Sequence, residues 1–423
     1  MKSPSLTAKL GAMRGNGVAA GLLRRAVLRQ LGRLRHGQLT LIEGAERRVF
    51  GECETTLTAE IQVLDPAVWG LVAGNGSIGS GEAYVHGYWN SPDLTAVIRV
   101  FVANLEVLDG MERGMARLGC PLLHAVHWLN RNTRRGSQRN IAAHYDLGNE
   151  LFEQFLDPTL MYSAAQFRRP EDSLEEAQVN KLERICRKLE LKPSDHLLEI
   201  GSGWGSMAIH AALHHGCRVT TTTLSREQFR YCRQRIDELG LQSRITLLLQ
   251  DYRELQGRFD KLVSIEMIEA VGHRYLPTYF QQCARLLKDD GLMLLQAITI
   301  RDQRFEQARR SVDFIQRYIF PGGALPSVHR MLEAATDHSD LNLVHLEDFG
   351  SHYARTLRLW HENLSQARGR LAQMGYDDYF YRLWEFYFCY CEGGFIERSI
   401  GTAQLLLAKP GARPEALLGH FDA

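Results

Sequence analysis

The stretch LLEIGSGWG at 197–205 is the feature that most constrains how this chain can fold. An apolar, strand-like run breaks there into three glycines at alternate positions, and a helical pattern follows at 206–212. Glycine lets the backbone turn tightly and lets a ligand approach the main chain, so the loop is typical of a nucleotide-cofactor site between a strand and a helix. The alternative is a βα turn whose glycines serve packing alone.

The next strand, at 218–223, indicates which nucleotide cofactor fits. A dinucleotide would require Asp or Glu about 20 residues after the glycines, to bind a ribose hydroxyl. This chain has Thr223 there, and in the turn that follows we expect Ser225 to cap a helix, with Gln228 at the capping-box position. The pattern therefore disfavours nicotinamide and flavin cofactors.

Strand-like and helical segments alternate beyond residue 140. The expected strands are Leu197–Ile200, Val219–Thr223, Ile245–Leu249, Lys261–Ile265 and Leu292–Ala297. Apolar strands separated by helices predict a mostly parallel sheet that is covered on both faces, with the ligand at the carboxyl ends of the strands. The expected fold class is α/β, with a doubly wound sheet.

A series of motifs resembles one enzyme family over most of residues 140–410. The motifs are HYDLGNELF (144–152), LDPTLMYSAAQF (156–167), LLEIGSGWG (197–205), TTLSREQ (222–228), LLLQDYREL (247–255), SIEMIEAVGHRY (264–275), YIFPGGALPS (318–327), HYARTLRLW (352–360) and CEGGFIERSIGTAQLLLAK (391–409). The chain resembles the cyclopropane fatty acid synthase and mycolic acid methyltransferase family. This resemblance implies a seven-stranded methyltransferase core that uses S-adenosylmethionine, with a smaller amino-terminal α+β lipid-binding domain.

The resemblance also implies a set of cofactor contacts. S-adenosylmethionine is expected against Tyr162, Ser163, Gly201, Gly203, Thr223, Leu224, Gln228, Asp251 and Tyr252. Tyrosine faces suit a sulfonium ion, glycine backbone suits the methionine end, and Thr223 or Gln228 can bind ribose hydroxyls without an acid. Asp251 has a second interpretation, as a helix cap before Tyr252.

Attack of an alkene on a sulfonium methyl leaves a carbocation, which requires a dry, locally anionic site and a base. Glu269 closely follows the strand 261–265, although a helix-start carboxylate is its alternative role. In the family that the chain resembles, the matching glutamate and a tyrosine that falls on Tyr353 help to hold a bicarbonate that accepts the proton. The family's bicarbonate site also contains a cysteine, which falls on Ala164 in this sequence, and a histidine, which falls on Gln296. A backbone N–H and an amide still bind anions, so bicarbonate is expected as a second cofactor.

The amino-terminal region is basic, with ten Lys or Arg against two Glu in the first fifty residues. Apolar residues at helical spacing in 17–36, with arginines between them, favour an amphipathic helix on a bilayer surface. An ordinary helix with a solvated arginine face is the alternative. Strands are expected around 39–42, 58–63 and 68–72, and GSIGSGEAYVHGYW (76–89) resembles the family's lipid-binding module, where its residues could also serve packing alone.

These patterns predict three parts of the chain. A lipid-binding domain is expected at 1–130, a polar, basic linker at 131–140 and the catalytic domain at 141–423. Within the catalytic domain, the stretch 301–341 and the aromatic helix 376–390 are expected to cover the substrate channel, although the aromatic residues could be purely structural.

Composition limits the expected cellular location and the expected partners of the protein. No run of about 18 apolar residues occurs and no secretory signal is present, so we expect a cytoplasmic enzyme that associates peripherally with the inner face of the membrane. The net charge is +1, and no nucleic-acid partner is expected. The eight cysteines are scattered without paired metal spacing, so neither a metal site nor a disulfide is expected.

The leading hypothesis is transfer of a methylene unit from S-adenosylmethionine to the cis double bond of an unsaturated phospholipid acyl chain, which gives a cyclopropane. Three alternatives stay open. The product could be methylene- or methyl-branched, the substrate could be a small amine, or the chain could be a lipid-binding protein with an inactive catalytic domain. The amino-terminal module argues against the amine. A homodimer is expected from the family resemblance.

Overall fold

The computed structural model describes residues 17–113 and 148–417, and it divides the chain into two units. The smaller, amino-terminal unit extends to Leu123 and also contains Asp377–Gly393. The larger unit comprises His124–Tyr376 and Gly394–Ala423. The expected linker at 131–140 lies outside the described residues.

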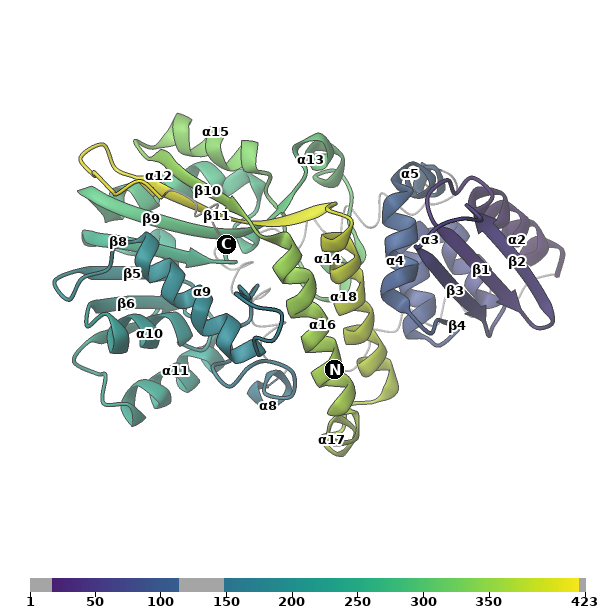
Figure 1. Ribbon diagram of the computed structural model, residues 1–423, viewed down its shortest axis with the longest axis horizontal. Coiled ribbons are helices and arrows are strands. Elements are labelled where there is room, and N and C mark those ends of the chain that lie inside the picture. The colour runs from purple at the N-terminus through teal and green to yellow at the C-terminus, as the bar shows by residue number, and fades with distance from the viewer. Residues whose placement is uncertain (1–16, 114–147, 418–423) are drawn as a thin grey trace. The chain divides into compact units, whose positions relative to one another are not determined.

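A seven-stranded sheet forms the centre of the larger unit in the described residues (Figure 1). Its order is β10-β11-β9-β8-β5-β6-β7. The strands are β5 (His196–Ile200), β6 (Arg218–Thr223), β7 (Ile245–Leu249), β8 (Phe259–Ile265), β9 (Leu287–Ile300), β10 (Asn342–Asp348) and β11 (Ile400–Ala408). Strands β5 to β9 are parallel, whereas β11 is antiparallel to β9 and β10. The α/β class and the five expected strands are confirmed, and β10 and β11 are additions that the pattern did not predict.

Helices cover both faces of this sheet, because its strands place successive apolar residues in two different clusters. Leu198 and Leu262 face the cluster that α12 and α15 complete, while Leu197 and Val263 face the cluster of α9, α10 and α11. The helices of the larger unit are α8 (Asn149–Phe152), α9 (Leu174–Lys188), α10 (Ser206–His214), α11 (Arg226–Glu238), α12 (Leu276–Leu286), α13 (Asp302–Ala308), α14 (Phe314–Tyr318), α15 (Val328–His338), α16 (Gly350–Gln366) and α17 (Arg368–Gln373). Three short 3-10 helices follow β7 and β8: η3 (Tyr252–Glu254), η4 (Ile268–Ala270) and η5 (His273–Tyr275).

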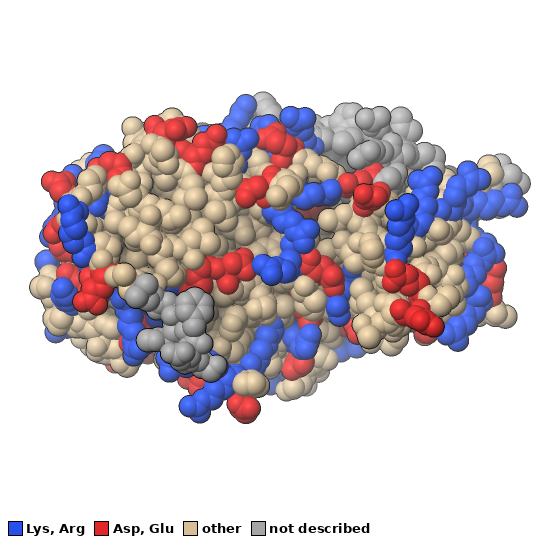
Figure 2. Space-filling model, turned by 45° about the horizontal axis from the view of Figure 1, so that its top comes forward, with Lys and Arg blue, Asp and Glu red and all other residues tan. Residues whose placement is uncertain are grey.

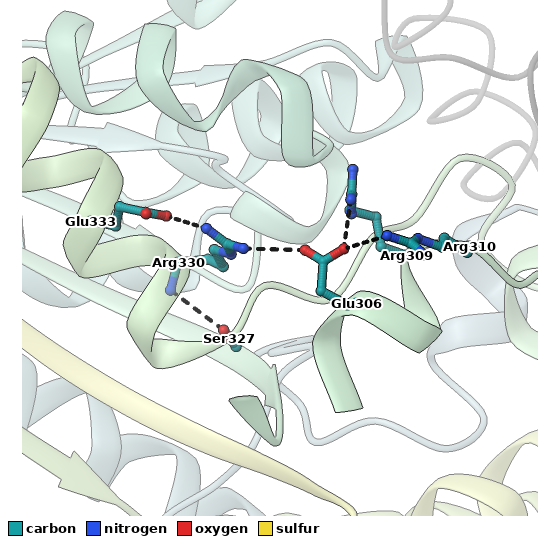
Figure 3. A network of polar contacts seen from close by, with 6 residues as sticks. All are labelled: Glu306, Arg309, Arg310, Ser327, Arg330 and Glu333. Atoms are coloured by element: carbon teal, nitrogen blue, oxygen red, sulfur yellow. Dashed lines mark hydrogen bonds and ion pairs between the residues drawn. The ribbon is translucent and has the colours of Figure 1, made fainter. Parts of the chain in front are cut away.

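The segment between β9 and β10 carries α13, α14 and α15. At its surface Glu306 of α13 accepts hydrogen bonds from Arg309 and from Arg330 of α15, within the ion-pair network of Figure 3. Deeper in the unit, the Ala324 N–H donates to the Glu269 carbonyl oxygen at 2.9 Å. The inserted segment therefore lies beside a residue that we expect in catalysis.

The amino-terminal unit is the expected small α+β domain. Its described residues form a four-stranded sheet, in the order β2-β1-β3-β4, with β1 antiparallel to β2 and parallel to β3. Its elements are α2 (Gly17–Leu31), β1 (Gln38–Glu43), β2 (Glu46–Gly51), β3 (Thr58–Val63), α3 (Ala67–Val85), β4 (Trp89–Asn90), α4 (Leu94–Ala103) and α5 (Leu105–Arg113). The expected strand at 68–72 is wrong. Val68, Trp69 and Val72 are buried at helical spacing in α3.

Helix α18 (Asp378–Ile396) belongs mostly to the amino-terminal unit, and its expected place over a substrate channel stays a prediction. The Tyr84 hydroxyl donates to Glu385 at 2.6 Å, and Arg382 donates to the carbonyls of Tyr84 and Trp89. The Tyr84 and Trp89 rings pack edge to face, with centroids 5.0 Å apart. These residues of the lipid-module motif thus pack the small unit together with a helix from far along the sequence.

Helix α2 turns arginines toward solvent. Arg25 and Arg29 are exposed, and Leu22 beside them is 60% exposed. Arg24 instead pairs with Glu43 at 2.7 Å. On the face drawn in Figure 2, Lys and Arg side chains are frequent on the amino-terminal unit. Among the described residues, no helix has the length and apolar character needed to span a bilayer.

Candidate active site

The candidate site lies where the parallel strands of the larger unit end. The N–H groups of Gly201 and Ser202 donate to the Thr222 carbonyl at 3.1 and 2.9 Å, which joins the end of β5 to the end of β6. Glu266 follows the last residue of β8. Carboxyl ends of parallel strands meet at one edge of a sheet, so this edge collects the loops that the sequence pattern singled out.

The positions of the 201–205 loop require glycine for different local reasons. All three adopt positive φ angles, of 99° at Gly201, 51° at Gly203 and 96° at Gly205. A Cβ on Gly205 would lie 3.3 Å from the Cys232 sulfur, which is a packing constraint. A Cβ on Gly203 would meet nothing within 4 Å, so open space adjoins the loop there. Gly203 is therefore the position at which a ligand can approach the main chain.

The second loop of the site follows β6 as expected. The Thr223 hydroxyl donates to the Gln228 side-chain oxygen at 2.8 Å, and both side chains are buried, with half-buried Leu224 between them. Ser225 accepts from the Gln228 N–H and caps α11, which confirms the expected capping. No acid stands in this loop before Glu227.

Asp251 and Tyr252 are engaged within the protein. Asp251 caps η3 by accepting from the Arg253 N–H, and the Arg253 guanidinium also lies 2.6 Å from its carboxylate. The capping interpretation of Asp251 is thus confirmed. The Tyr252 ring packs edge to face on Tyr279, with centroids 5.4 Å apart. A contact of either residue with adenine stays a prediction.

Tyr162 and Ser163 lie in a segment that crosses the site. The Tyr162 ring is 5.2 Å from the Trp360 ring and 6.3 Å from the Phe320 ring. Ser163 accepts a hydrogen bond from the Lys181 ammonium at 2.6 Å. Aromatic rings and a buried lysine therefore line this part of the site.

The predicted residues Ala164, Gln296 and Tyr353 converge on Glu266, which the sequence reasoning missed. The Ala164 N–H and the Gln296 amide donate to Glu266 Oε1 at 3.0 and 2.9 Å. The Tyr353 hydroxyl donates to Glu266 Oε2 at 2.8 Å. Gln404 in turn donates to the Gln296 side-chain oxygen at 3.0 Å, so the amide of Gln296 has a fixed orientation. Three donors thus hold one carboxylate in place.

Glu266 also has an unusual backbone. Its φ angle is 49°, in the left-handed region that non-glycine residues seldom adopt. Such a conformation costs roughly 1–3 kcal/mol and persists where the surrounding structure enforces it, often at functional sites. A signal was available in SIEMIEAVGHRY, where a second glutamate stands directly after the strand, three residues before Glu269.

Glu269 lies beside this carboxylate. One of its oxygens accepts from the Ile298 N–H at 2.5 Å, while the buried Oε2 atom has no hydrogen-bond partner. Burial, and after it the negative charge of Glu266, raises the pKa of Glu269 to about 8. Burial raises the pKa of Glu266 as well, but its three hydrogen bonds and the charge of Lys181 favour the ionised form. At neutral pH the proton of this pair therefore resides on Glu269.

Aromatic side chains pack against Tyr353, the residue that donates to Glu266. The Tyr353 ring stacks on Phe395 with centroids 4.5 Å apart and meets Trp360 edge to face at 6.0 Å. Gly201 adjoins the same segment, because a Cβ there would lie 3.2 Å from the Met267 side chain. The glycine loop, the aromatic rings and the carboxylates thus belong to one site, suited to a positively charged reacting group.

Comparisons with known proteins identify the family. The sequence model of the mycolic acid cyclopropane synthetase family matches residues 132–405. The chain belongs to this family. It is 38% identical over 355 residues to tuberculostearic acid methyltransferase UfaA1 of Mycobacterium tuberculosis, a match that covers 80% of each chain. It is 35% identical over 354 residues to cyclopropane-fatty-acyl-phospholipid synthase of Escherichia coli K12, covering 83% of this chain and 88% of that one.

Solved structures of this family share the fold. Mycolic acid cyclopropane synthase CmaA1, complexed with SAH and CTAB, matches with a TM-score of 0.60 and 31% identity, over 64% of this chain and 98% of that chain. This member of the cyclopropane synthetase family is therefore an S-adenosylmethionine-dependent C-methyltransferase. The open space at Gly203 and the buried Thr223 and Gln228 fit that cofactor.

The expected bicarbonate does not fit this arrangement. The three donors predicted to hold it already donate to Glu266. A second anion against these donors would stand next to a buried carboxylate, and like charges in a buried site repel strongly. The Glu266 carboxylate therefore takes the position in which a bicarbonate was expected.

Proposed function

We propose that this enzyme converts cis double bonds of unsaturated phospholipid acyl chains into cyclopropanes, with the Glu266 carboxylate as the proton acceptor. The observation that carries the proposal is the convergence of Ala164, Gln296 and Tyr353 on Glu266. The placement of Glu266 supports this role, because its carboxylate lies in an aromatic site beside the glycine loop. The names of the relatives, which include a cyclopropane-fatty-acyl-phospholipid synthase, support the lipid substrate.

The reaction places clear demands on the residues. Bound S-adenosylmethionine would supply an electrophilic methyl group. Attack by the alkene would break the sulfur–methyl bond, release S-adenosylhomocysteine and leave a positive charge on the neighbouring acyl carbon. The rings of Tyr162, Tyr353 and Trp360 exclude water from that carbon and face its charge. Loss of a proton from the new methyl group then supplies the electron pair that closes the three-membered ring. Glu266 accepts this proton.

Glu269 supports the acceptor in this mechanism. Its pKa of about 8 keeps it protonated and neutral at physiological pH. The pair therefore carries one negative charge, located on Glu266, which stabilises the carbocation and is neutralised when the proton arrives. Two negative charges in the same dry site would oppose each other.

The central test is product analysis. Purified protein is incubated with isotopically labelled S-adenosylmethionine and vesicles of a monounsaturated phospholipid, and the released fatty acids are examined by mass spectrometry and proton NMR. We expect one added methylene unit and the upfield signals of cyclopropane protons. Unlabelled fatty acid beside a protein that binds S-adenosylhomocysteine would reject the proposed activity, and would favour the alternative of an inactive catalytic domain.

Two variants test the assignment of the base. Glu266→Gln is expected to lower kcat by about 10²-fold or more, the range in which a general base contributes, with cofactor affinity unchanged. Omitting bicarbonate from the buffer should leave the wild-type rate unchanged. The matched control is Glu171→Gln, which makes the same change at an exposed position. A rate that depends on added bicarbonate, with Glu266→Gln still active, would assign the proton to the anion instead.

A methylene-branched product is the second candidate, because the relative with 38% identity is a tuberculostearic acid methyltransferase. A hydride shift before proton loss would give an exocyclic alkene with the same mass as the ring. Proton NMR separates the two, since only the alkene has vinylic methylene protons. A saturated methyl branch would additionally require a hydride-donating reductant and would be heavier by two hydrogens.

A further inference from the structure

We propose that Glu183, Cys186, His210 and His215 form a binding site for a divalent transition-metal ion of the Zn²⁺ type, between α9 and α10. These residues take no part in the proposed reaction. Glu183 and Cys186 are three residues apart on α9, which places them on one face of that helix. His210 lies in α10 and His215 is its C-cap residue. The sequence analysis expected no metal site, because the cysteines have no paired metal spacing. These ligands come from two separate helices.

The ligand atoms are already close together. One ligand atom each from Cys186, His210 and His215 lies within 4.8 Å of the other two. Glu183 Oε2 is 3.4 Å from His210 Nε2 and 3.1 Å from His215 Nε2. In a tetrahedral zinc site, with bonds of 2.0–2.3 Å, neighbouring ligand atoms are roughly 3.3–3.6 Å apart. The glutamate-to-histidine distances are close to this spacing, and the separations among Cys186, His210 and His215, all within 4.8 Å, would shorten when an ion binds.

The donor set and its surroundings favour a metal. One thiolate, two imidazoles and one carboxylate are nitrogen, oxygen and sulfur ligands that Zn²⁺ prefers. Cys186 is fully buried and His210 is 8% exposed, so most of the water around these groups is already excluded. Arg187 donates to the other Glu183 oxygen at 2.7 Å and orients the carboxylate, as a hydrogen-bonded outer residue does in metal sites.

The carboxylate side of the proposed site borders a pocket. Glu183 lines a pocket of about 380 Å³ that is bounded further by Arg184, Arg187, Glu347 and His352. Burial raises the pKa of the Cys186 thiol, so the thiolate forms only when the ion displaces its proton to solvent. The bound ion would fasten α9 to α10, the helix that begins at the glycine loop. Its expected effect is thus on stability.

The test uses the full-length protein, stripped with a chelator and titrated with Zn²⁺ or Co²⁺ alone. We expect one ion per chain, a thiolate-to-cobalt charge-transfer band, and a higher thermal midpoint with Zn²⁺. His215→Gln and Cys186→Ser should each weaken binding by at least about 100-fold. His215 is only half-buried, so its variant keeps the test usable if Cys186→Ser does not fold.

The neighbouring His214 provides the control. It is exposed, with its ring 4.6 Å from that of His210, but it lies outside the ligand set. His214→Gln should bind Zn²⁺ as the wild type does. Absence of binding, a cobalt spectrum without thiolate charge transfer, or equal affinity of the His215→Gln variant would overturn the site. Glu183 would then serve only as a hydrogen-bond acceptor for the two histidines.

Discussion

Glu266 illustrates how much a single residue can decide in this enzyme. The sequence placed Ala164, Gln296 and Tyr353 around an anion, and that grouping is found in the structure. The motif contains Glu266, but the meeting of its carboxylate with these three donors depends on a left-handed φ of 49°. Backbone conformation at one residue is set by the strands and loops around it, and no local pattern encodes it.

Lys181 is expected to set the charge state of Glu266. It is fully buried, and burial lowers its pKa to about 7 against the opposing pull of Glu266 and Asp157. Lys181→Met removes a positive charge that stabilises the Glu266 carboxylate, so the pKa of Glu266 rises further. The rising limb of kcat against pH should therefore move to higher pH.

The shape of the pH profile separates this role from a structural one. A packing defect in Lys181→Met would lower kcat by the same factor at every pH, without moving the limb. Lys192→Met, at an exposed position of the same unit, should leave the profile as it is. An unmoved limb in Lys181→Met would show that the ammonium does not act on Glu266.

Glu269 should make the protein less stable as pH rises. Its pKa is raised from 4.5 to about 8, so between these values the folded protein keeps a proton that the unfolded chain releases. The free energy of unfolding then falls with increasing pH, by at most about 1.4 kcal/mol per unit. Glu269→Gln has no proton to lose and should flatten this slope.

Urea unfolding at the two ends of that pH window measures the effect. Glu171→Gln, at an exposed position, should keep the wild-type slope. Parallel slopes for the wild type and Glu269→Gln would mean that Glu269 is ionised in the folded protein at neutral pH, contrary to the assigned proton.

At the scale of elements, the glycine turn between β5 and α10 offers a sharp test of cofactor binding. Gly203 and Gly44 share a positive φ, of 51° and 59°, and open space where a Cβ would stand. Only Gly203 lies in the cofactor loop. Gly203→Ala and Gly44→Ala should each destabilise the fold by about 1–2 kcal/mol, the cost of a left-handed conformation for alanine.

Affinity for S-adenosylhomocysteine then distinguishes the two variants. Calorimetric titration is expected to show a Kd about tenfold higher for Gly203→Ala, which corresponds to a loss of about 1.4 kcal/mol of binding free energy. The Kd of Gly44→Ala should not change. Equal affinity in both would place the cofactor away from the Gly203 backbone.

The burial of each helix or strand explains whether the sequence pattern could predict it. Strands β5, β8 and β9 carry apolar residues on both faces, and continuous apolar runs between helical segments are a strong local signal. The segment at 68–72 was misread as a strand, because a short apolar run has no periodicity that separates strand from helix. Helix α18 was recognised as an aromatic helix, but its packing partners Tyr84 and Trp89 lie some three hundred residues earlier.

At the scale of the whole molecule, the basic amino-terminal unit is the proposed membrane contact. Each exposed arginine near an anionic bilayer contributes about 1 kcal/mol. Arg25→Gln with Arg29→Gln should therefore weaken binding to phosphatidylserine-containing vesicles by about 2 kcal/mol, or roughly 30-fold. Sedimentation of the protein with vesicles measures this, and added salt should weaken wild-type binding.

Neutral substitutions elsewhere control for net charge. Arg226→Gln with Arg370→Gln removes two exposed arginines from the larger unit and should leave vesicle binding near the wild-type level. Equal losses in both double variants would indicate a diffuse charge effect. The ordinary-helix interpretation of α2 would then be the better one.

The sequence alone determined the parallel core and the glycine loop and disfavoured a dinucleotide, and its motifs indicated S-adenosylmethionine through the family resemblance. These features depend on local periodicity and on short motifs, which act over a few residues. Only the tertiary structure decided that Glu266 fills the anion position, that α18 completes the amino-terminal unit, and that Cys186 meets two histidines of another helix. Each of these depends on contacts between distant segments, whose geometry arises from the packing of the whole chain.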